Sequence, residues 1–150
     1  MPLRPRRPWR QPRQRADVVN RIIINIDVPE LSPAISFYTA ALGLEHTRTL
    51  DDDVAELTGA AATIYLLRKP AGSEAVHSPP IPRNFDRHWT PVHFDLVVDD
   101  VDAATVRALA AGATRETGHV DWKGSRCVSF GDPFGHGFCF IQFESGTYED

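Results

Sequence analysis

The chain has 150 residues and a mass of 16.7 kDa, enough for one domain or for two small repeats that share a core. Hydrophobic residues make up 42% of the chain and charged residues 24%, which excludes a collagen, a coiled coil and a chain disordered throughout. The longest apolar runs are four residues, whereas a membrane span needs about 20, so we expect no membrane partner.

The net charge of −4 is unevenly distributed along the chain. Residues 1–15 contain six arginines and no acidic residue, and the other 135 residues carry ten basic and twenty acidic side chains. Prolines in this Arg/Pro-rich head remove backbone donors, so residues 1–17 are predicted to be disordered. The alternative is that the arginines bind the phosphates of a nucleic acid, but the acidic remainder of the chain would repel it. We therefore expect no nucleic-acid partner.

Two cysteines, Cys127 and Cys139, are too few for a disulfide scaffold. Free thiols persist in a reducing compartment, so the sequence predicts a cytoplasmic protein. Cys139 lies between two phenylalanines and is expected to be a small buried apolar residue.

Two segments 70 residues apart show the same pattern. Residues 22–28 (IIINIDV) and 92–98 (VHFDLVV) are rich in β-branched residues and predict strands, each followed by a helical pattern. The first helix is expected to have Ser32 as its N-cap, and the second to have Asp100 or Asp102. Gly43 and Gly112 are expected to end them. The helical residues expected to face the core are Ile35, Phe37, Tyr38 and Leu42 in the first helix and Val101, Val106 and Leu109 in the second.

Three shorter strand-like segments follow each helix, so each half has the order strand, helix, strand, strand, strand. The predicted strands are 44–50, 54–58 and 62–67 in the first half and 114–120, 126–130 and 138–143 in the second. A half of about 50 residues is too small to bury a core alone. We therefore predict an α+β fold in which two βαβββ modules form a curved mixed sheet with the helices outside it.

The domain is predicted to span residues 18–150, with repeats at about 21–68 and 92–144. Residues 69–91 carry five prolines and no periodicity, which indicates a long linker. Open strand edges in this arrangement predict a homodimer.

Alternation along the two repeat strands places polar residues on one face of each. Asn25 and Asp27 share a face of the first strand, and His93 and Asp95 share the equivalent face of the second. The opposite faces are apolar and are expected to pack under the helices, so these four residues should surround a concave cavity. His93 could then act as a general base with Asp95 as its orienting carboxylate. The alternative is a surface or dimer role for this pair.

Two segments resemble motifs of the vicinal oxygen chelate superfamily, which includes glyoxalase I, extradiol dioxygenases, and fosfomycin and bleomycin resistance proteins. Residues 26–44 (IDVPELSPAISFYTAALGL) resemble its opening motif, and residues 130–143 (FGDPFGHGFCFIQF) resemble its D-P-x-G turn and final strand. The resemblance covers residues 21–144 and implies paired βαβββ modules, each forming half of a cleft.

Metal-dependent members of that superfamily place four ligands, usually His or Gln, Glu, His and Glu, on the inner strands. The resemblance puts Ile23, Tyr65, His93 and Cys139 at these positions. Isoleucine cannot bind a metal and tyrosine rarely does, so the usual octahedral site is not expected. His93 and Cys139 could hold Zn²⁺ only with two further donors, for which Asp95 or Asn25 lie one pleat away. We therefore predict no metal or other cofactor.

The leading hypothesis is a metal-free protein of the sequestering or resistance type that binds a small organic molecule in the cleft. Arg126 is expected to hold an anionic group of that molecule, while other histidines, including His88 and His136, are expected at the surface. The predicted ligand-binding residues are Asn25, Asp27, Tyr65, His93, Asp95, Trp122, Arg126 and Cys139. The alternative is an enzyme, either a lactoylglutathione lyase-like lyase or isomerase with His93 as base, or a dioxygenase type with a rearranged divalent metal site.

Overall fold

The computed structural model describes residues 21–149, so the predicted disordered head lies outside the described residues. The first module comprises β1 (Ile23–Val28), α1 (Leu31–Leu42), β2 (Glu45–Leu50), β3 (Val54–Thr58) and β4 (Thr63–Arg68). Its strands form a sheet of order β1-β4-β3-β2, in which β1 and β4 are parallel and the other pairs antiparallel. The predicted order of one helix and four strands is thus confirmed for this half.

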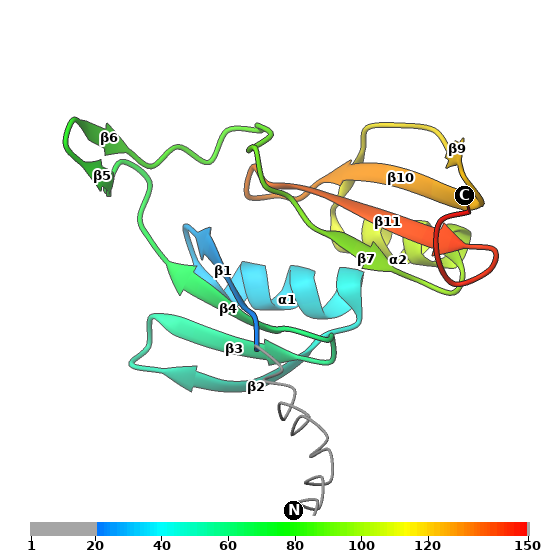
Figure 1. Cartoon of the computed structure of the whole chain (residues 1–150). Coiled ribbons are helices and arrows are strands. Elements are labelled where there is room, and N and C mark those ends of the chain that lie inside the picture. The colour runs from blue at the N-terminus through cyan, green and yellow to red at the C-terminus, as the bar shows by residue number, and fades with distance from the viewer. Residues whose placement is uncertain (1–20, 150) are drawn as a thin grey trace, which may run out of the picture.

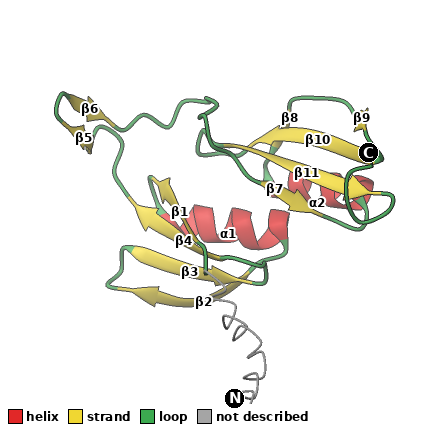
Figure 2. Cartoon of the chain, viewed as in Figure 1, coloured by secondary structure: helices red, strands yellow, loops and turns green. Residues whose placement is uncertain are grey.

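The second module has the same order of elements, except that the predicted strand 114–120 is wrong, because the structure has two short strands at 114–115 and 120–122 in its place. It comprises β7 (Asp95–Val97), α2 (Val101–Ala111), β8 (Thr114–Arg115), β9 (Val120–Trp122), β10 (Ser125–Gly131) and β11 (Gly137–Phe143). The sheet order is β7-β11-β10-β8, and β9 also pairs with β10. The two helices lie next to each other with one sheet beside each (Figures 1 and 2). The predicted α+β class with mixed sheets is therefore confirmed.

The sequence correctly predicted the start of α2 and the ends of both helices, but not the start of α1. Asp100 caps α2 by accepting hydrogen bonds from two backbone amides of its first turn, as predicted. The prediction of a Ser32 cap for α1 is wrong, because the helix begins at Leu31 and Glu30 occupies the N-cap position without a side-chain cap bond. The earlier start buries Leu31 on the same helical face as Ala34. Both helices end at left-handed glycines, as predicted.

The inward face of α2 differs from the prediction. Val106 and Leu109 are exposed, whereas the residues that face the core are Val101, Ala104, Thr105 and Ala108. These residues are mostly small and recur at the helical spacing, so α2 can lie close against α1 and β11. Close helix packing, which needs small side chains, thus outweighs the burial of the larger aliphatic ones.

One hydrophobic core is shared by the two modules. In the second module, the rings of Phe130, Phe138 and Phe140 lie 5.4–5.5 Å apart, centroid to centroid. Phe37 of α1 joins this cluster through edge-to-face contacts with Phe134 at 6.0 Å and Phe138 at 6.3 Å. The sharing explains how two halves of about 50 residues each acquire a stable interior.

The connection between the modules contains regular structure that the sequence analysis did not predict. Within residues 69–91, β5 (Glu74–His77) and β6 (Pro80–Pro82) form an exposed hairpin that projects from the body (Figure 1). The β-branched residues Val76 and Ile81 pair across it. Residues 83–91, which we call the strap, then lead into the second module. No helix within residues 21–149 is long and apolar enough to cross a membrane.

Candidate functional site

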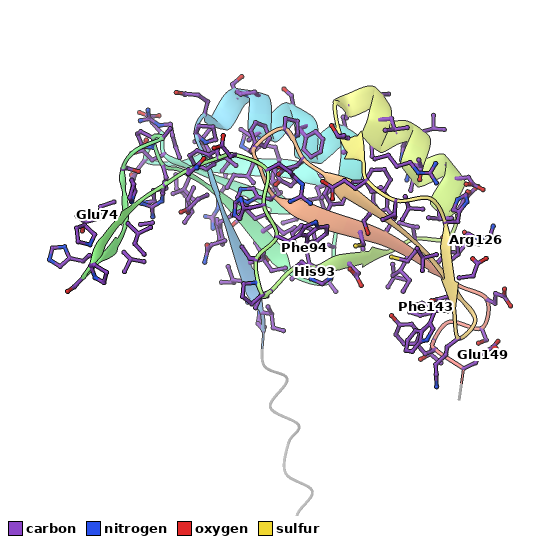
Figure 3. All side chains as sticks on the ribbon, turned by 90° about the horizontal axis from the view of Figure 1, so that it is seen from above. Glu74, His93, Phe94, Arg126, Phe143 and Glu149 are labelled. Carbon is purple, nitrogen blue, oxygen red and sulfur yellow. The ribbon has the colours of Figure 1, made fainter. Side chains whose placement is uncertain are left out.

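A cavity of about 460 Å³ lies between β1 and the segment that leads into β7. Figure 3 shows His93 and Phe94 on this segment, between the two sheets. Its lining residues are Ile24, Asn25, Ile26, Asp27, His88, Thr90, Val92, His93, Phe94, His136 and Gly137. Of the apolar members, Ile24, Ile26 and Phe94 also pack on the core, whereas Val92 is exposed. The polar members converge from β1, the strap, the segment before β7 and the β10–β11 turn. This combination is typical of a small-molecule site.

The structure brings some of the predicted ligand-binding residues together and separates others. Asn25, Asp27 and His93 line the cavity, but so do Ile24 and Ile26 from the opposite face of β1, which was expected to pack only on the core. The other predicted residues are not among its lining residues: Tyr65, Asp95, Trp122, Arg126 and Cys139. Trp122 packs edge-on against the ring of Tyr148, and the guanidinium of Arg126 donates to the Asp121 carboxylate at 2.9 Å. Their role in ligand binding stays a prediction, without support from this cavity.

Asp95 and Cys139 lie beside His93. The imidazole Nε2 of His93 is 3.5 Å from the Asp95 carboxylate, and the potential ligand atoms of all three residues lie within 4.8 Å of one another. Strand pairing sets this arrangement, because Cys139 of β11 is the register partner of Asp95. Burial is the largest cause that raises the pKa of the Cys139 thiol to about 12. The thiol is therefore protonated at neutral pH, and as a free group it is not a nucleophile.

Tyr65 occupies the corresponding position in the first module, where it pairs with Asn25. Its hydroxyl donates to the Glu56 carboxylate at 2.6 Å, and the same carboxylate accepts from Arg48 and Thr47, each at 2.9 Å. The sequence analysis missed Glu56 because its partners lie on two other strands, β2 and β4. The phenol and the carboxylate bind each other here and have few groups left to bind a ligand, and neither residue is among those that line the cavity.

The Glu56 network predicts a pH dependence of stability. Hydrogen bonds from Arg48 and then from Tyr65 lower the pKa of Glu56 from its ordinary value of 4.5 to about 2. A carboxyl whose pKa is lower in the folded state contributes stability that is present above pH 4.5 and is lost as the pH falls toward 2. Glu56→Gln should therefore flatten the fall of the free energy of unfolding over this pH range, measured by urea unfolding. Glu45→Gln, at an exposed carboxyl on β2, should keep the wild-type slope, and equal slopes in all three proteins would contradict the prediction.

The position of His136 differs from the prediction. The sequence analysis expected an exposed turn residue, but His136 is half-buried and lines the cavity. Its Nε2–H donates to the backbone carbonyl of Asp27 at 2.7 Å. His88 lines the same cavity from the strap. His136 and its partner Asp27 are 109 residues apart in the sequence, so no periodicity could reveal this contact.

A buried carboxylate holds the turn that carries His136. Asp132 accepts hydrogen bonds from the backbone amides of Phe134 and His136, both at 2.8 Å, and from the hydroxyl of Tyr38 on α1. Burial, followed by the charge of Asp132, raises the pKa of Tyr38 well above its ordinary value, so the phenol remains a donor. The hydrogen bond from Tyr38 to Asp132 thus ties α1 of the first module to the β10–β11 turn of the second, which carries His136.

The strap crosses the β10–β11 turn and is tied at several points. Arg83 donates to the Asp27 carboxylate at 2.7 Å, and Arg87 forms a two-point ion pair with Glu116. The amide of His88 donates to the carbonyl of Gly135 at 3.0 Å. A second hollow of about 540 Å³ between the strap and β5–β6 shares Asp27 and two histidines with the first cavity.

Comparisons with known proteins identify the family to which this fold belongs. The family model of the glyoxalase-like domain matches residues 23–141. The chain belongs to the glyoxalase-like family of the vicinal oxygen chelate superfamily. No curated protein sequence matches this glyoxalase-like protein.

Several solved structures share the glyoxalase-like fold at low sequence identity. A lactoylglutathione lyase from Agrobacterium tumefaciens aligns with a TM-score of 0.61 and 21% identity over 87% of this chain and 98% of its own. A glyoxalase/bleomycin resistance protein/dioxygenase from Nocardioides aligns with a TM-score of 0.60 and 19% identity over 90% and 91%. A fosfomycin resistance protein from Listeria monocytogenes aligns with a TM-score of 0.62 and 17% identity over 82% and 90%. At these identities the likeness shows the fold.

The residues of this glyoxalase-like protein do not fit the four-ligand site that the superfamily resemblance implies. Ile23 has no donor atom, and the hydroxyl of Tyr65 is bonded to Glu56. Only the second module offers ligating groups at the corresponding positions, an imidazole and a thiol. An octahedral site for a hard cation needs oxygen ligands from both modules, and the described residues do not supply them. They do contain the grouping of His93, Asp95 and Cys139, which could hold a metal ion of another kind.

Proposed function

We propose that this glyoxalase-like protein binds a small organic molecule in the cavity between its modules. The observation that carries the proposal is a cavity of about 460 Å³ with aliphatic and aromatic walls and several convergent polar groups. The names of the fold neighbours include resistance proteins as well as a lyase, which supports a sequestering or resistance role alongside a catalytic one.

The lining residues indicate the chemistry of the ligand. Among residues 21–149, no lysine or arginine lines the cavity, and the nearby Arg83 is paired with Asp27. Asn25 and the histidine rings offer hydrogen-bonding groups without the fixed positive charge of a lysine or arginine. We therefore propose an uncharged, flat molecule with polar atoms at its edge, in place of the anionic group that Arg126 was expected to hold.

A cavity-filling variant tests the proposal. Val92 lines the cavity and is 81% exposed, so tryptophan there should fold normally and occupy the ligand space. We expect uncharged aromatic fragments to bind the wild type and Val92→Trp to weaken them at least about tenfold, or about 1.4 kcal/mol. The measurement is the change in intrinsic fluorescence during titration, for which Trp89 is a reporter 5.3 Å from the His93 ring.

The matched control is Val97→Trp. Val97 is 66% exposed and lies outside the cavity lining, so this variant should bind fragments like the wild type. Absence of binding by the wild type, or equal weakening in both variants, would contradict the proposal.

A second candidate function is proton transfer by His93, as in a lyase or isomerase. The observation that favours it is the 3.5 Å approach of His93 Nε2 to Asp95, because a carboxylate at that distance can stabilise a protonated imidazole. This role requires a ring nitrogen of His93 that no metal ion occupies.

We also propose a homodimer and a cytoplasmic location. All six residues of β2, an edge strand, are exposed, and Ile23 on the other edge of that sheet is exposed as well. Free Cys127 and Cys139 support the location.

A further inference from the structure

We propose that Glu116 is a positioning residue of the cavity, because it fixes His88 in the cavity wall by holding the strap. Its carboxylate binds the side chains on either side of this histidine, those of Arg87 and Trp89. His88 lines the cavity, whereas Glu116 does not, so Glu116 acts through the strap without touching a ligand. The inference rests on the small-molecule function proposed above and names a residue that controls the same site.

The backbone of the second module places the Glu116 carboxylate. Glu116 directly follows β8, and its amide donates to the carbonyl of Ser129 in β10 at 2.9 Å. This bond continues the pairing of β8 with β10, so the sheet fixes the start of the side chain. The side chain is 26% exposed, and solvent screens a partly buried ion pair less than an exposed one. The carboxylate is therefore a fixed point to which a neighbouring segment can attach.

The strap directs neighbouring side chains to different partners. The guanidinium of Arg87 forms two hydrogen bonds with the Glu116 carboxylate, and the indole Nε1–H of Trp89 donates to the same group at 3.2 Å. We call these contacts the clamp. His88, between them, lines the cavity, and its ring lies 6.1 Å from that of His136. Arg87 also donates to the backbone carbonyl of His88, so the clamp acts on both neighbours of His88 and on its backbone.

Two paired glycines make room for the side chains of the clamp. Gly131 and Gly137 are register partners at the end of the β10–β11 hairpin. A Cβ at Gly131 would lie 2.7 Å from Nε of Arg87, and a Cβ at Gly137 would lie 2.7 Å from the ring of Trp89. The guanidinium carbon of Arg87 also lies 4.6 Å from the centroid of the Trp89 ring. This close fit limits the positions that the strap can take while Glu116 holds it.

The strap has no helix or strand of its own, so its position depends on individual contacts. Arg83 ties its first residue to Asp27, and the amide of His88 donates to the carbonyl of Gly135 at 3.0 Å. Glu116 supplies the side-chain anchors on both sides of His88. Without the charge of Glu116, the strap should open more often, and His88 should leave the cavity wall in a larger fraction of the molecules.

Binding of indole, a flat uncharged probe with a polar edge, tests the effect on the cavity. We expect Glu116→Gln to weaken indole binding about fivefold to tenfold, measured by NMR titration of the full chain. His88→Ala should weaken binding by at least that factor. The double variant should bind indole like His88→Ala, because two changes that act through one group are not additive. An unchanged affinity in either single variant, or additive losses in the double variant, would overturn the proposal.

Hydrogen exchange tests the clamp without a ligand. The amide of His88 is bonded to Gly135, so its exchange with solvent reports how often the strap leaves the turn. We expect Glu116→Gln to raise the exchange rate of this amide at least about tenfold, with a urea midpoint of unfolding close to that of the wild type. Equal exchange rates in the two proteins would overturn the clamp, even if indole binds to both.

Asp121→Asn is the matched control. Asp121 pairs with Arg126 at 2.9 Å in the same module, but this pair is exposed and neither residue lines the cavity. The variant removes one carboxylate charge, as Glu116→Gln does, and should keep the wild-type indole affinity and His88 exchange rate. A change as large as that of Glu116→Gln would overturn the proposal. If indole fails to bind the wild type while Glu116→Gln still speeds the exchange, the small-molecule function fails and the clamp stands.

Discussion

Replacing Asp132 by alanine should lower the free energy of unfolding by about 3 kcal/mol, one of the largest effects expected for a single substitution in this chain. The side chain is only 8% exposed and accepts three hydrogen bonds, two from the backbone of its own turn and one from Tyr38. Removing it leaves a buried phenol and two amides without partners. Urea unfolding at neutral pH measures the loss, and a change below about 1 kcal/mol would show that the tie is not needed.

Two further variants locate the origin of that effect. Asp121→Ala removes an exposed carboxylate that pairs with Arg126 on the surface, and it should change stability by less than about 1 kcal/mol. Tyr38→Phe removes the hydrogen bond between the modules and keeps the aromatic packing. It should cost less than Asp132→Ala, because the two amide bonds of the turn remain.

Gly135→Ala should destabilise the protein by about 3 kcal/mol and also weaken binding at the cavity. Gly135 has φ = +94°, which costs a residue with a side chain about 1–2 kcal/mol. A Cβ there would also lie 2.5 Å from the carbonyl oxygen of Phe85 in the strap, a backbone atom that cannot rotate away. The substitution should therefore displace the strap, which carries His88 over the cavity. Urea unfolding and the fragment titration measure the two effects.

Gly146→Ala separates backbone strain from the clash. Gly146 has φ = +85°, close to that of Gly135, but a Cβ there meets nothing within 4 Å. This control should lose about 1–2 kcal/mol and bind fragments like the wild type. Equal losses in the two variants would mean that the close approach of the strap contributes nothing.

The sequence predicted the features that depend on local pattern. Alternation along β1 correctly predicted that Ile26 and Val28 face the core, because the side-chain period of two is a property of every strand. It did not predict that both faces of β1 line the cavity. The helix ends at Gly43 and Gly112 were also predictable from local sequence, because a left-handed helix terminus favours glycine.

Features that depend on distant contacts were not predictable. The inward face of α2 is decided by how closely α1 approaches, which the helix's own sequence does not specify. His136 reaches the cavity because Asp132 and the strap hold its turn, and neither contact leaves a periodic signal. Arg126 was expected to meet a ligand, but its partner is Asp121, five residues away across the β9–β10 hairpin. A charged residue near a turn often finds a local partner first.

The two halves of this repeat have taken on different tasks. In the first, Asp27 is neutralised by Arg83, and Tyr65 and Glu56 satisfy each other. In the second, the imidazole of His93, the carboxylate of Asp95 and the thiol of Cys139 form no ion pair with a lysine or arginine of residues 21–149. The first copy still supplies Asn25 and Asp27 to the cavity, but the second holds more polar groups that are free to act. Attempts to redesign this protein for new chemistry should therefore begin with the second copy.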